Sequence, residues 1–374
     1  MLRFIHSSDL HLGKRFGQLP EDLRGRLREA RHAAIQRLAE QARAHGADTV
    51  LLAGDTFDTE TPAPEILRQA LAAMRDHAPL RWILLPGNHD SLAADPLWTA
   101  MRAAAPDNVT LAVEPAPIAL GDNAVLLPAP CPARRPGRDL TEWMDGAITP
   151  DGAVRIGLAH GAIQSFSEDS GASDILAPDR AQRAGLSYLA LGDWHGRMQI
   201  NERTFYSGTP EPDRFKHAEP GQALLVGIDG PSAPPQVTPL PTGSFTWQTL
   251  ELALMSGDDA AARLAGHLVT GAARRQTLLR VVASGRCSVA SRSALLTALD
   301  KVAPEFAYAA IDDDALASDC TSTDLDLIDR SGALRNAAET LLTQSTDERL
   351  ALEERDIARA ALARLFAYCE KVAS

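Results

Sequence analysis

The chain has 374 residues, of which 45% are hydrophobic, and its formal net charge at pH 7 is −12. This composition supports one large domain plus a smaller one and excludes a chain that is disordered throughout. The negative charge argues against DNA binding through a uniformly basic surface, although positive charge can be local on an acidic protein. One arginine-rich segment is interpreted as a solvated helix face; it carries Arg24, Arg26, Arg28 and Arg31.

Neither a membrane-spanning segment nor a signal peptide is expected. The sequence has no run of about 18 apolar residues, and its N-terminal residues lack the long apolar stretch of a signal peptide. None of the four cysteines has a spacing typical of a zinc site or a redox pair. We therefore expect a cytoplasmic protein with reduced structural thiols.

The first half of the chain alternates short apolar runs with amphipathic helical segments, which is typical of an α/β domain. Helices are predicted at residues 22–45 and 64–77, the first of them ending at Gly46. The predicted strands are residues 2–6, 48–53, 81–85, 124–127, 155–159, 187–191 and 223–228.

A smaller domain is predicted after a segment rich in proline, glycine and serine between Gly230 and Ser244. We place domains at residues 1–242, 243–330 and 331–374. The middle domain alternates strands with helices, as a small α+β domain does. The last is predicted to be wholly helical, and Ser345 and Glu348 form a capping box that would open its final helix.

Five short motifs follow predicted strands of the first domain. Strand ends are where α/β folds place ligand sites, and carboxylate, imidazole and amide oxygen are metal ligands. Glycines before three of the motif residues permit close backbone approach. One such motif is weak evidence, but five in this order predict a metal centre. They are Asp9-Leu10-His11, Gly54-Asp55-Thr56-Phe57-Asp58, Gly87-Asn88-His89-Asp90, His160-Gly161 and Gly192-Asp193-Trp194-His195-Gly196.

The five motifs resemble those of the calcineurin-like metallophosphoesterases, in particular the SbcD-type DNA repair nucleases and their YhaO-like relatives. The resemblance covers roughly residues 1–230 with specific motifs and thereafter only the general plan. It implies an α/β fold: a two-sheet sandwich flanked by helices, then a small α+β capping domain and a helical C-terminus. It also implies a two-metal-dependent phosphodiesterase that hydrolyses DNA in repair, as an exonuclease or additionally as a single-strand endonuclease.

The resemblance implies two adjacent divalent cations, Mn²⁺ or alternatively Mg²⁺. The implied ligands are Asp9, His11 and His195 for the first cation, Asn88 and His160 for the second, and Asp55 bridging both. His89 would be a catalytic histidine that is not a ligand, and Asp90 would orient its ring.

One position departs from the family pattern, which usually has Gly-His-x-His where this chain has Gly192-Asp193-Trp194-His195. Asp193 therefore replaces a histidine ligand of the second cation. We favour ligation by Asp193 itself, since a carboxylate also binds these metals and favours harder ions such as Mn²⁺ or Mg²⁺. Two alternatives stay open: the second site fills only with substrate, or it is degenerate and the protein is a scaffold.

The motifs do not identify the substrate, because the same site can hydrolyse several classes of phosphate ester. A manganese-dependent DNA nuclease, a small-molecule phosphodiesterase or phosphatase, and a weakly active scaffold subunit of an ATPase complex stay open. The mass beyond residue 245 favours the nuclease, which must position a duplex. Candidate phosphate contacts there, which read equally well as solubilising residues, are Arg274, Arg275, Arg280, Arg286 and Arg292.

The resemblance also implies partners. The C-terminal helices of SbcD-like proteins dock onto an SMC-like ATPase of the SbcC or YhaN type, and residues 331–374 form suitable helices, unless these pack on their own chain. A homodimer is implied through the helices at 22–45 and 64–77. Four small or apolar residues suit a helix interface or an ordinary core: Ala70, Ala72, Ala73 and Met74. His217 is interpreted as structural.

Overall fold

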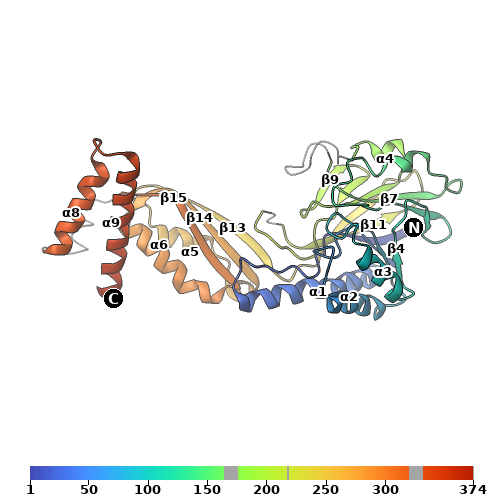
Figure 1. Cartoon of the computed structure of the whole chain (residues 1–374), viewed down its shortest axis with the longest axis horizontal. Helices are drawn as coiled ribbons and strands as arrows, with labels where there is room; N and C mark the ends of the chain where they lie inside the picture. The colour runs from blue at the N-terminus through green and yellow to red at the C-terminus, as the bar shows by residue number, and fades with distance from the viewer. Residues whose placement is uncertain (164–175, 217–218, 320–331, 374) are drawn as a thin grey trace. The chain divides into compact units, whose positions relative to one another are not determined.

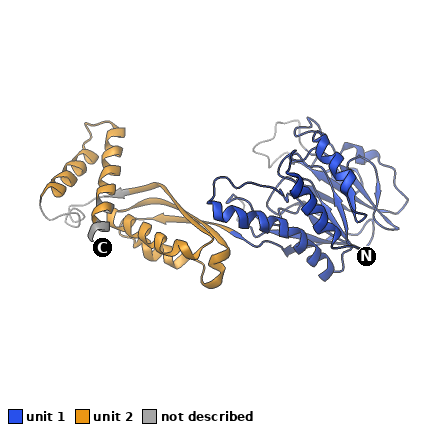
Figure 2. Cartoon of the chain, turned by 60° about the horizontal axis from the view of Figure 1, so that its bottom comes forward, with its two compact units in different colours: residues 1–246 blue, residues 247–374 orange. Residues whose placement is uncertain are grey.

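The computed structural model describes the whole chain except residues 164–175, 217–218, 320–331 and 374. The chain divides into two compact units, Met1–Thr246 and Trp247–Ser374 (Figure 2). The finer division into domains 1–242, 243–330 and 331–374 stays a prediction. His217 and Cys320 lie outside the described residues, so the interpretation of His217 is not assessed.

The first unit contains two six-stranded sheets. The first sheet has the order β12-β11-β1-β2-β3-β4, and strands β1 to β4 run parallel to one another. Strand β11 pairs with β1 in the antiparallel direction. The bounds are β1 (Leu2–Ser7), β2 (Thr49–Leu52), β3 (Arg81–Leu84), β4 (Val109–Leu111), β11 (Gln222–Ile228) and β12 (Gln236–Pro241).

The second sheet has the order β5-β6-β7-β8-β10-β9. Strands β6, β7, β8 and β10 are parallel, and the edge strands β5 and β9 are antiparallel to their neighbours. The bounds are β5 (Ile118–Ala119), β6 (Ala124–Ala129), β7 (Val154–His160), β8 (Tyr188–Gly192), β9 (Met198–Asn201) and β10 (Thr204–Tyr206).

The central strands β1, β2 and β3 carry apolar residues on both faces because each face is covered. Successive side chains of a strand point to opposite faces. Phe4 and Leu51 therefore join the core between the two sheets, where they meet residues such as Ile156. Their neighbours Ile5 and Val50 join the core under the helices. This alternation builds a layered sandwich, so the predicted α/β class with two sheets and flanking helices is confirmed.

Helices cover the outer faces of the sandwich. On the first sheet these are α1 (Glu21–Ala44), α2 (Pro64–Arg75) and α3 (Asp95–Ala104), which pack in one core with β1, β2 and β3 (Figure 1). On the second sheet they are α4 (Arg180–Arg183) and the 3₁₀ turn Glu142–Gly146. Helix α3 was not predicted.

The second unit contains a three-stranded sheet, two helices packed on it and a helical hairpin. The sheet order is β13-β14-β15, and β14 and β15 are parallel. The bounds are β13 (Thr246–Leu254), α5 (Ala260–His267), β14 (Thr277–Ser288), α6 (Val289–Val302), β15 (Tyr308–Asp319), α8 (Ala333–Thr346) and α9 (Leu352–Ala373). The unit is α+β with a helical C-terminus, as expected. None of the helices in the described part of the chain is both long and apolar enough to cross a membrane.

The predicted capping box at Ser345 is wrong. Ser345 lies in the last turn of α8, where its hydroxyl donates to the carbonyl oxygen of Leu342 at 2.7 Å. Asp347 then accepts the backbone N–H of Arg349 at 3.0 Å in the connecting turn, and the final helix begins only at Leu352. Short polar side chains stabilise turns as well as helix starts, which explains why the pattern misled.

Candidate metal centre

The five motifs meet at one edge of the sandwich. Strands β1, β2 and β3 are parallel, as are β7 and β8, so the carboxyl ends of each set lie together. The residues following these strand ends include Asp9 and His11 after β1, Asp55 after β2, Asn88 after β3, His160 at the end of β7, and Asp193 and His195 after β8.

Two groups of these side chains could each hold a cation. In each group the ligand atoms lie within 4.8 Å of one another; the groups are Asp9, His11 and His195, and Asp9, Asp55 and His160. His11 Nε2 lies 3.2 Å from His195 Nε2. Asp55 Oδ2 lies 3.6 Å from His11 Nε2 and 3.5 Å from His160 Nε2. Asp55 therefore stands between the groups, as a bridging ligand must.

Asp193 and Asn88 lie beside the second group. Asp193 Oδ1 is 3.9 Å from His160 Nε2. Asn88 precedes His89, whose backbone N–H donates to Asp55 Oδ1 at 2.9 Å. The structure thus brings the Asp193 carboxylate close to His160 and the backbone next to Asn88 close to Asp55.

Four nominated residues adopt a backbone conformation that is rare outside glycine. The φ angles are 56° for Asp9, 41° for His11, 52° for Asp55 and 102° for Asp193. Each such residue costs about 1–3 kcal/mol and persists only where the surroundings enforce it, which is common at functional sites.

Three glycines make room for the centre. A Cβ atom at Gly54 or Gly192 would collide with the ring of His160, and one at Gly87 would collide with the carboxylate of Asp55. The close backbone approach expected at these glycines is therefore confirmed.

The three histidines present the same ring nitrogen to the centre. In His160 and His195, Nδ1 is hydrogen-bonded to an oxygen, which leaves the lone pair of Nε2 directed at the other ligands. In His11, Nδ1 lies close to a carboxylate oxygen but makes no well-aligned hydrogen bond with it. The facing oxygens are Asp58 Oδ1 for His11 at 3.2 Å, the Ala53 carbonyl for His160 at 2.8 Å, and Asp213 Oδ1 for His195 at 3.0 Å.

Several buried atoms of the centre have no hydrogen-bond partner among the described residues: Asp9 Oδ1, Asn88 Oδ1 and His160 Nε2. Leaving a polar atom buried and unsatisfied costs about 1–3 kcal/mol. Oxygen and imidazole donors of this kind suit divalent cations. The residues present therefore fit a metal centre.

The electrostatics also favour a cation. Burial opposes a charge on His160, but the carboxylates of Asp55, Asp9 and Asp193 hold its pKa well above the usual value. Burial would likewise raise the pKa of Asp55, yet the charge of His160 keeps it below the usual value. The centre thus attracts positive charge, as a proton or as a metal ion.

His89 lies at the side of the centre. Its Nδ1 donates to the carbonyl oxygen of Asp58 at 2.9 Å. Its ring stands edge-on to that of His11, with centroids 4.8 Å apart and an interplanar angle of 89°. Because a carbonyl only accepts, Nδ1 carries the proton and Nε2 is left as the reactive nitrogen.

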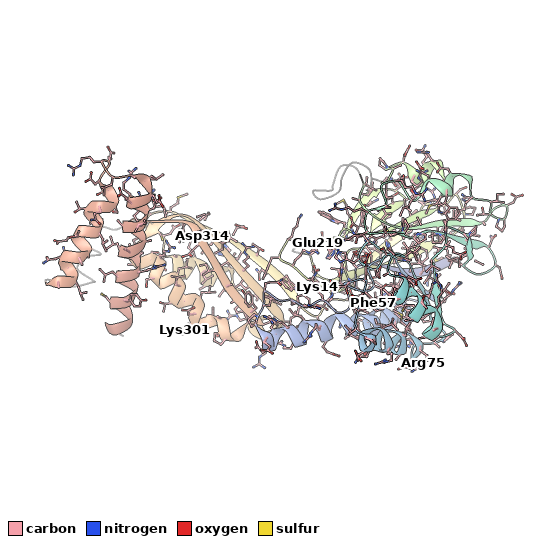
Figure 3. The ribbon with its side chains drawn as sticks, viewed as in Figure 1. Lys14, Phe57, Arg75, Glu219, Lys301 and Asp314 are labelled. Carbon is pink, nitrogen blue, oxygen red and sulfur yellow. The ribbon has the colours of Figure 1, made fainter. Side chains whose placement is uncertain are left out.

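The expectation that Asp90 orients the His89 ring is corrected. Both carboxylate oxygens of Asp90 accept backbone N–H groups, from Gly87 at 2.7 Å and from Phe57, labelled in Figure 3, at 3.0 Å. Burial, followed by the charge of Asp55, raises the pKa of Asp90 to about 7. Asp90 instead joins the loops that follow β2 and β3.

Replacing Asp90 with alanine should lower the free energy of unfolding by about 2–4 kcal/mol, because two buried N–H groups lose their acceptor. Asp90→Asn retains one acceptor oxygen and should cost less. Urea unfolding in EDTA measures both, with the exposed Asp107→Ala as control. A wild-type midpoint for Asp90→Ala would remove this role.

No role in the centre was assigned from the sequence to three residues that lie beside it, namely Asp58, Asp213 and Arg31. Asp58 and Asp213 lie next to the Nδ1 atoms of His11 and His195. Asp213 also forms an ion pair at 2.7 Å with Lys14, which is labelled in Figure 3. Arg31 is only 1% exposed, so its interpretation as part of a solvated face is wrong. Its spacing from Leu27, four residues earlier on the buried side of α1, was the available signal.

Three arginines proposed for phosphate contact in the second unit already have carboxylate partners. The pairs are Arg274 with Glu305 at 2.6 Å, Arg280 with Asp312 at 2.8 Å and Arg292 with Asp313 at 2.7 Å. A guanidinium engaged in this way is less available to a phosphate, which favours their interpretation as ordinary surface residues.

Comparison with known proteins agrees with the motifs. Residues 2–183 match the family described as calcineurin-like phosphoesterase. The uncharacterized metallophosphoesterase YhaO of Bacillus subtilis (strain 168) is 27% identical, and the match covers 61% of this chain and 57% of YhaO. The SbcD component of the nuclease SbcCD from Rhodobacter capsulatus is 29% identical, covering 64% of this chain and 69% of that protein.

A structural comparison adds a more distant likeness. The crystal structure of TT1561 from Thermus thermophilus superposes with a TM-score of 0.41 at 10% identity, covering 64% of this chain and 99% of that one.

Proposed function

We propose that the protein is a divalent-metal-dependent phosphodiesterase that hydrolyses DNA, because residues 2–183 match the calcineurin-like phosphoesterase family. The observation that carries the proposal is that two buried atoms without hydrogen-bond partners, Asp9 Oδ1 and His160 Nε2, lie inside a group of further ligand atoms. DNA is proposed as the substrate because a relative that matches 64% of the chain is named as part of a nuclease.

The proposed ligands follow from the geometry. Asp9, His11 and His195 would hold one cation, Asn88, His160 and Asp193 the other, and Asp55 would contact both. Such cations would supply the charge that neutralises a phosphodiester and would acidify water at neutral pH. We propose Mn²⁺, because three imidazole nitrogens are mixed with carboxylate and amide oxygens.

Side chains of the protein would position the cations, orient the ligands and transfer the proton. Asp55 fixes the spacing of the two groups, since its Oδ2 lies at similar distances from His11 and His160. Asp213 holds the His195 ring in one tautomer, and Asp58 places a carboxylate beside the His11 ring. His89 is aimed by the Asp58 carbonyl, so that its Nε2, when protonated, can give a proton to the leaving oxygen.

The test is hydrolysis of labelled duplex and single-stranded DNA by the full chain with Mn²⁺, Mg²⁺ or EDTA, beside an inactive Asp55→Ala control. We expect cutting with Mn²⁺ and none with EDTA. Turnover of a generic aryl phosphodiester without DNA cutting would favour a small-molecule enzyme. Inactivity on both substrates, with or without the metals, would contradict a self-sufficient enzyme and favour the scaffold.

Asp193→Ala should weaken one of two Mn²⁺ sites at least about tenfold, because it removes a carboxylate next to His160. Calorimetric titration measures the number of sites and each affinity. Asp193→His, which restores the family pattern, should keep two sites and shift preference towards softer ions. Unchanged binding by Asp193→Ala would exclude it as a ligand, and a wild type with one site would favour filling by substrate.

We also propose, from the same relatives, that α8 and α9 dock onto an SMC-like ATPase and that the protein acts in DNA repair in the cytoplasm. The hairpin supports docking because its second helix exposes large apolar side chains, with Ile357 63% and Tyr368 69% exposed. A homodimer through α1 and α2 remains a proposal. Ala70 and Met74 are completely buried in the core of the first unit, so they cannot form such an interface.

A further inference from the structure

The loop that carries Asp9 and His11 is held on its N–H side by the loop after β2. The backbone N–H of Asp9 donates to the carbonyl of Gly54 at 3.1 Å, and that of His11 donates to the carbonyl of Asp55 at 2.9 Å. Because Asp9 and His11 both have positive φ, this loop needs external support to keep its shape.

The carbonyl side of the same loop is held by Arg31 from α1. Arg31 Nε donates to the carbonyl of Leu10 at 2.7 Å, and one terminal nitrogen, Nη2, donates to that of Asp9 at 2.8 Å. The other terminal nitrogen, Nη1, donates to the carbonyl of Glu211 at 2.7 Å. A planar guanidinium reaches three carbonyls in different directions, which a lysine ammonium at the same place does not.

Thr209 extends this support to His195. Its hydroxyl lies 2.9 Å from the Asp9 carbonyl, and its backbone N–H donates to the carbonyl of His195 at 3.0 Å. Arg31 also lies 3.4 Å from the Thr209 hydroxyl. The three residues of the first cation group, Asp9, His11 and His195, are thus all tied to Arg31 directly or through one neighbour.

The charge of Arg31 does not explain its position. A buried positive charge near a cation site repels the cation, and burial lowers the pKa of Arg31, opposed by the charges of Asp213 and Glu211. The hydrogen bonds from Arg31 to three carbonyls indicate a contribution through geometry. Charge and geometry predict opposite effects of removing the guanidinium, so they can be separated.

We propose that Arg31 is a positioning residue for the first cation, which fixes the carbonyls of Asp9 and Leu10 and thereby aims the side chains of Asp9 and His11. The inference rests on the proposed metal-dependent function. It goes beyond it by assigning control of one of the two cation sites to a residue that is not a ligand.

The experiment is a Mn²⁺ titration of the full-length protein by calorimetry and electron paramagnetic resonance, without DNA. Arg31→Lys keeps the positive charge but loses the planar guanidinium, and Arg31→Met loses both. Thr209→Val removes only the hydroxyl group. Each should weaken one Mn²⁺ site about 10-fold or more, as loss of residues supporting ligands does. The other site should weaken less, because Asp9 is the only residue of the first group that also belongs to the second. The matched control is Arg28→Lys, an exposed arginine on the same helix.

Three outcomes overturn the inference. Arg31→Met binds Mn²⁺ more tightly, as a pure charge effect requires; Arg31→Lys and Thr209→Val bind both ions with wild-type affinity; or both sites weaken equally together with the melting temperature of the metal-free protein, as a general structural role requires. If the Arg31 variants fail to fold, Thr209→Val decides alone. A wild type that binds no Mn²⁺ overturns the proposed function as well, whereas a normal wild type with unaffected variants overturns only this inference.

Discussion

Replacing Asp55 with alanine should abolish hydrolysis, with a loss of at least about 10³-fold, and should weaken both cation sites together. Asp55 Oδ2 lies 3.6 Å from His11 Nε2 and 3.5 Å from His160 Nε2, so one carboxylate serves both groups. Its removal also leaves the repulsion between two neighbouring cations without a shared counter-charge. Initial rates of DNA cutting and a calorimetric Mn²⁺ titration measure the two effects.

The conservative variant separates charge from shape. Asp55→Asn keeps the volume, and its amide oxygen can still accept the backbone N–H of His89. We expect it to be nearly as inactive as Asp55→Ala, because the amide lacks the negative charge. The control is Asp48→Ala, an exposed aspartate just before the same strand. If Asp55→Asn retained activity within tenfold of wild type, Asp55 would not be a bridging ligand.

The strands that carry the motifs were predictable because both of their faces are covered. A strand such as β2, with Val50 under the helices and Leu51 between the sheets, reads as a continuous apolar run. Very short strands gave no such pattern: β4 and β10 have three residues each, too few for a period of two to be recognised.

The ligands were easier to predict than the residues that orient them. Asp9, His11 and Asp55 belong to short contiguous motifs, which can be recognised in the sequence alone. The partner of the His160 ring is the carbonyl of Ala53, 107 residues away, and every residue type has such a carbonyl. Arg31 and Asp9 likewise meet only once α1 has packed against the first sheet. Hydrogen bonds of this kind depend on tertiary packing, so no local sequence pattern predicts them.

The glycines show the reverse case, where local sequence and packing agree. Gly54 and Gly87 are next to motif residues in sequence, and in space they adjoin His160 and Asp55, which come from other strands. The folded centre therefore requires glycine at these positions, and the glycines are visible in the sequence because they stand next to the motif residues. A Gly87→Ala change would push into the Asp55 carboxylate, which is why the position admits only glycine.

His89→Ala should bind Mn²⁺ like wild type and lose about 10²–10⁴-fold in DNA cutting. The support that His89 gives to Asp55 comes from its backbone N–H, which the substitution retains. The ring itself contributes Nε2, whose orientation is fixed because Nδ1 donates to the Asp58 carbonyl. Metal titration and single-turnover kinetics on DNA, with the exposed His267→Ala as control, measure binding and chemistry separately.

Comparing two substrates with different leaving groups distinguishes two possible roles of His89. If its Nε2 protonates the departing oxygen, His89→Ala should lose much activity on DNA, because the alkoxide leaving group needs a proton. It should lose little on an aryl phosphodiester, whose aryloxide leaves without one. If His89 instead stabilises charge on the phosphate, both substrates should lose equally. Full activity of His89→Ala on DNA would exclude the histidine from the mechanism and leave the two cation groups to act alone. We expect the unequal loss, because the hydrogen bond from Nδ1 to the Asp58 carbonyl leaves Nε2 as the nitrogen available for proton transfer.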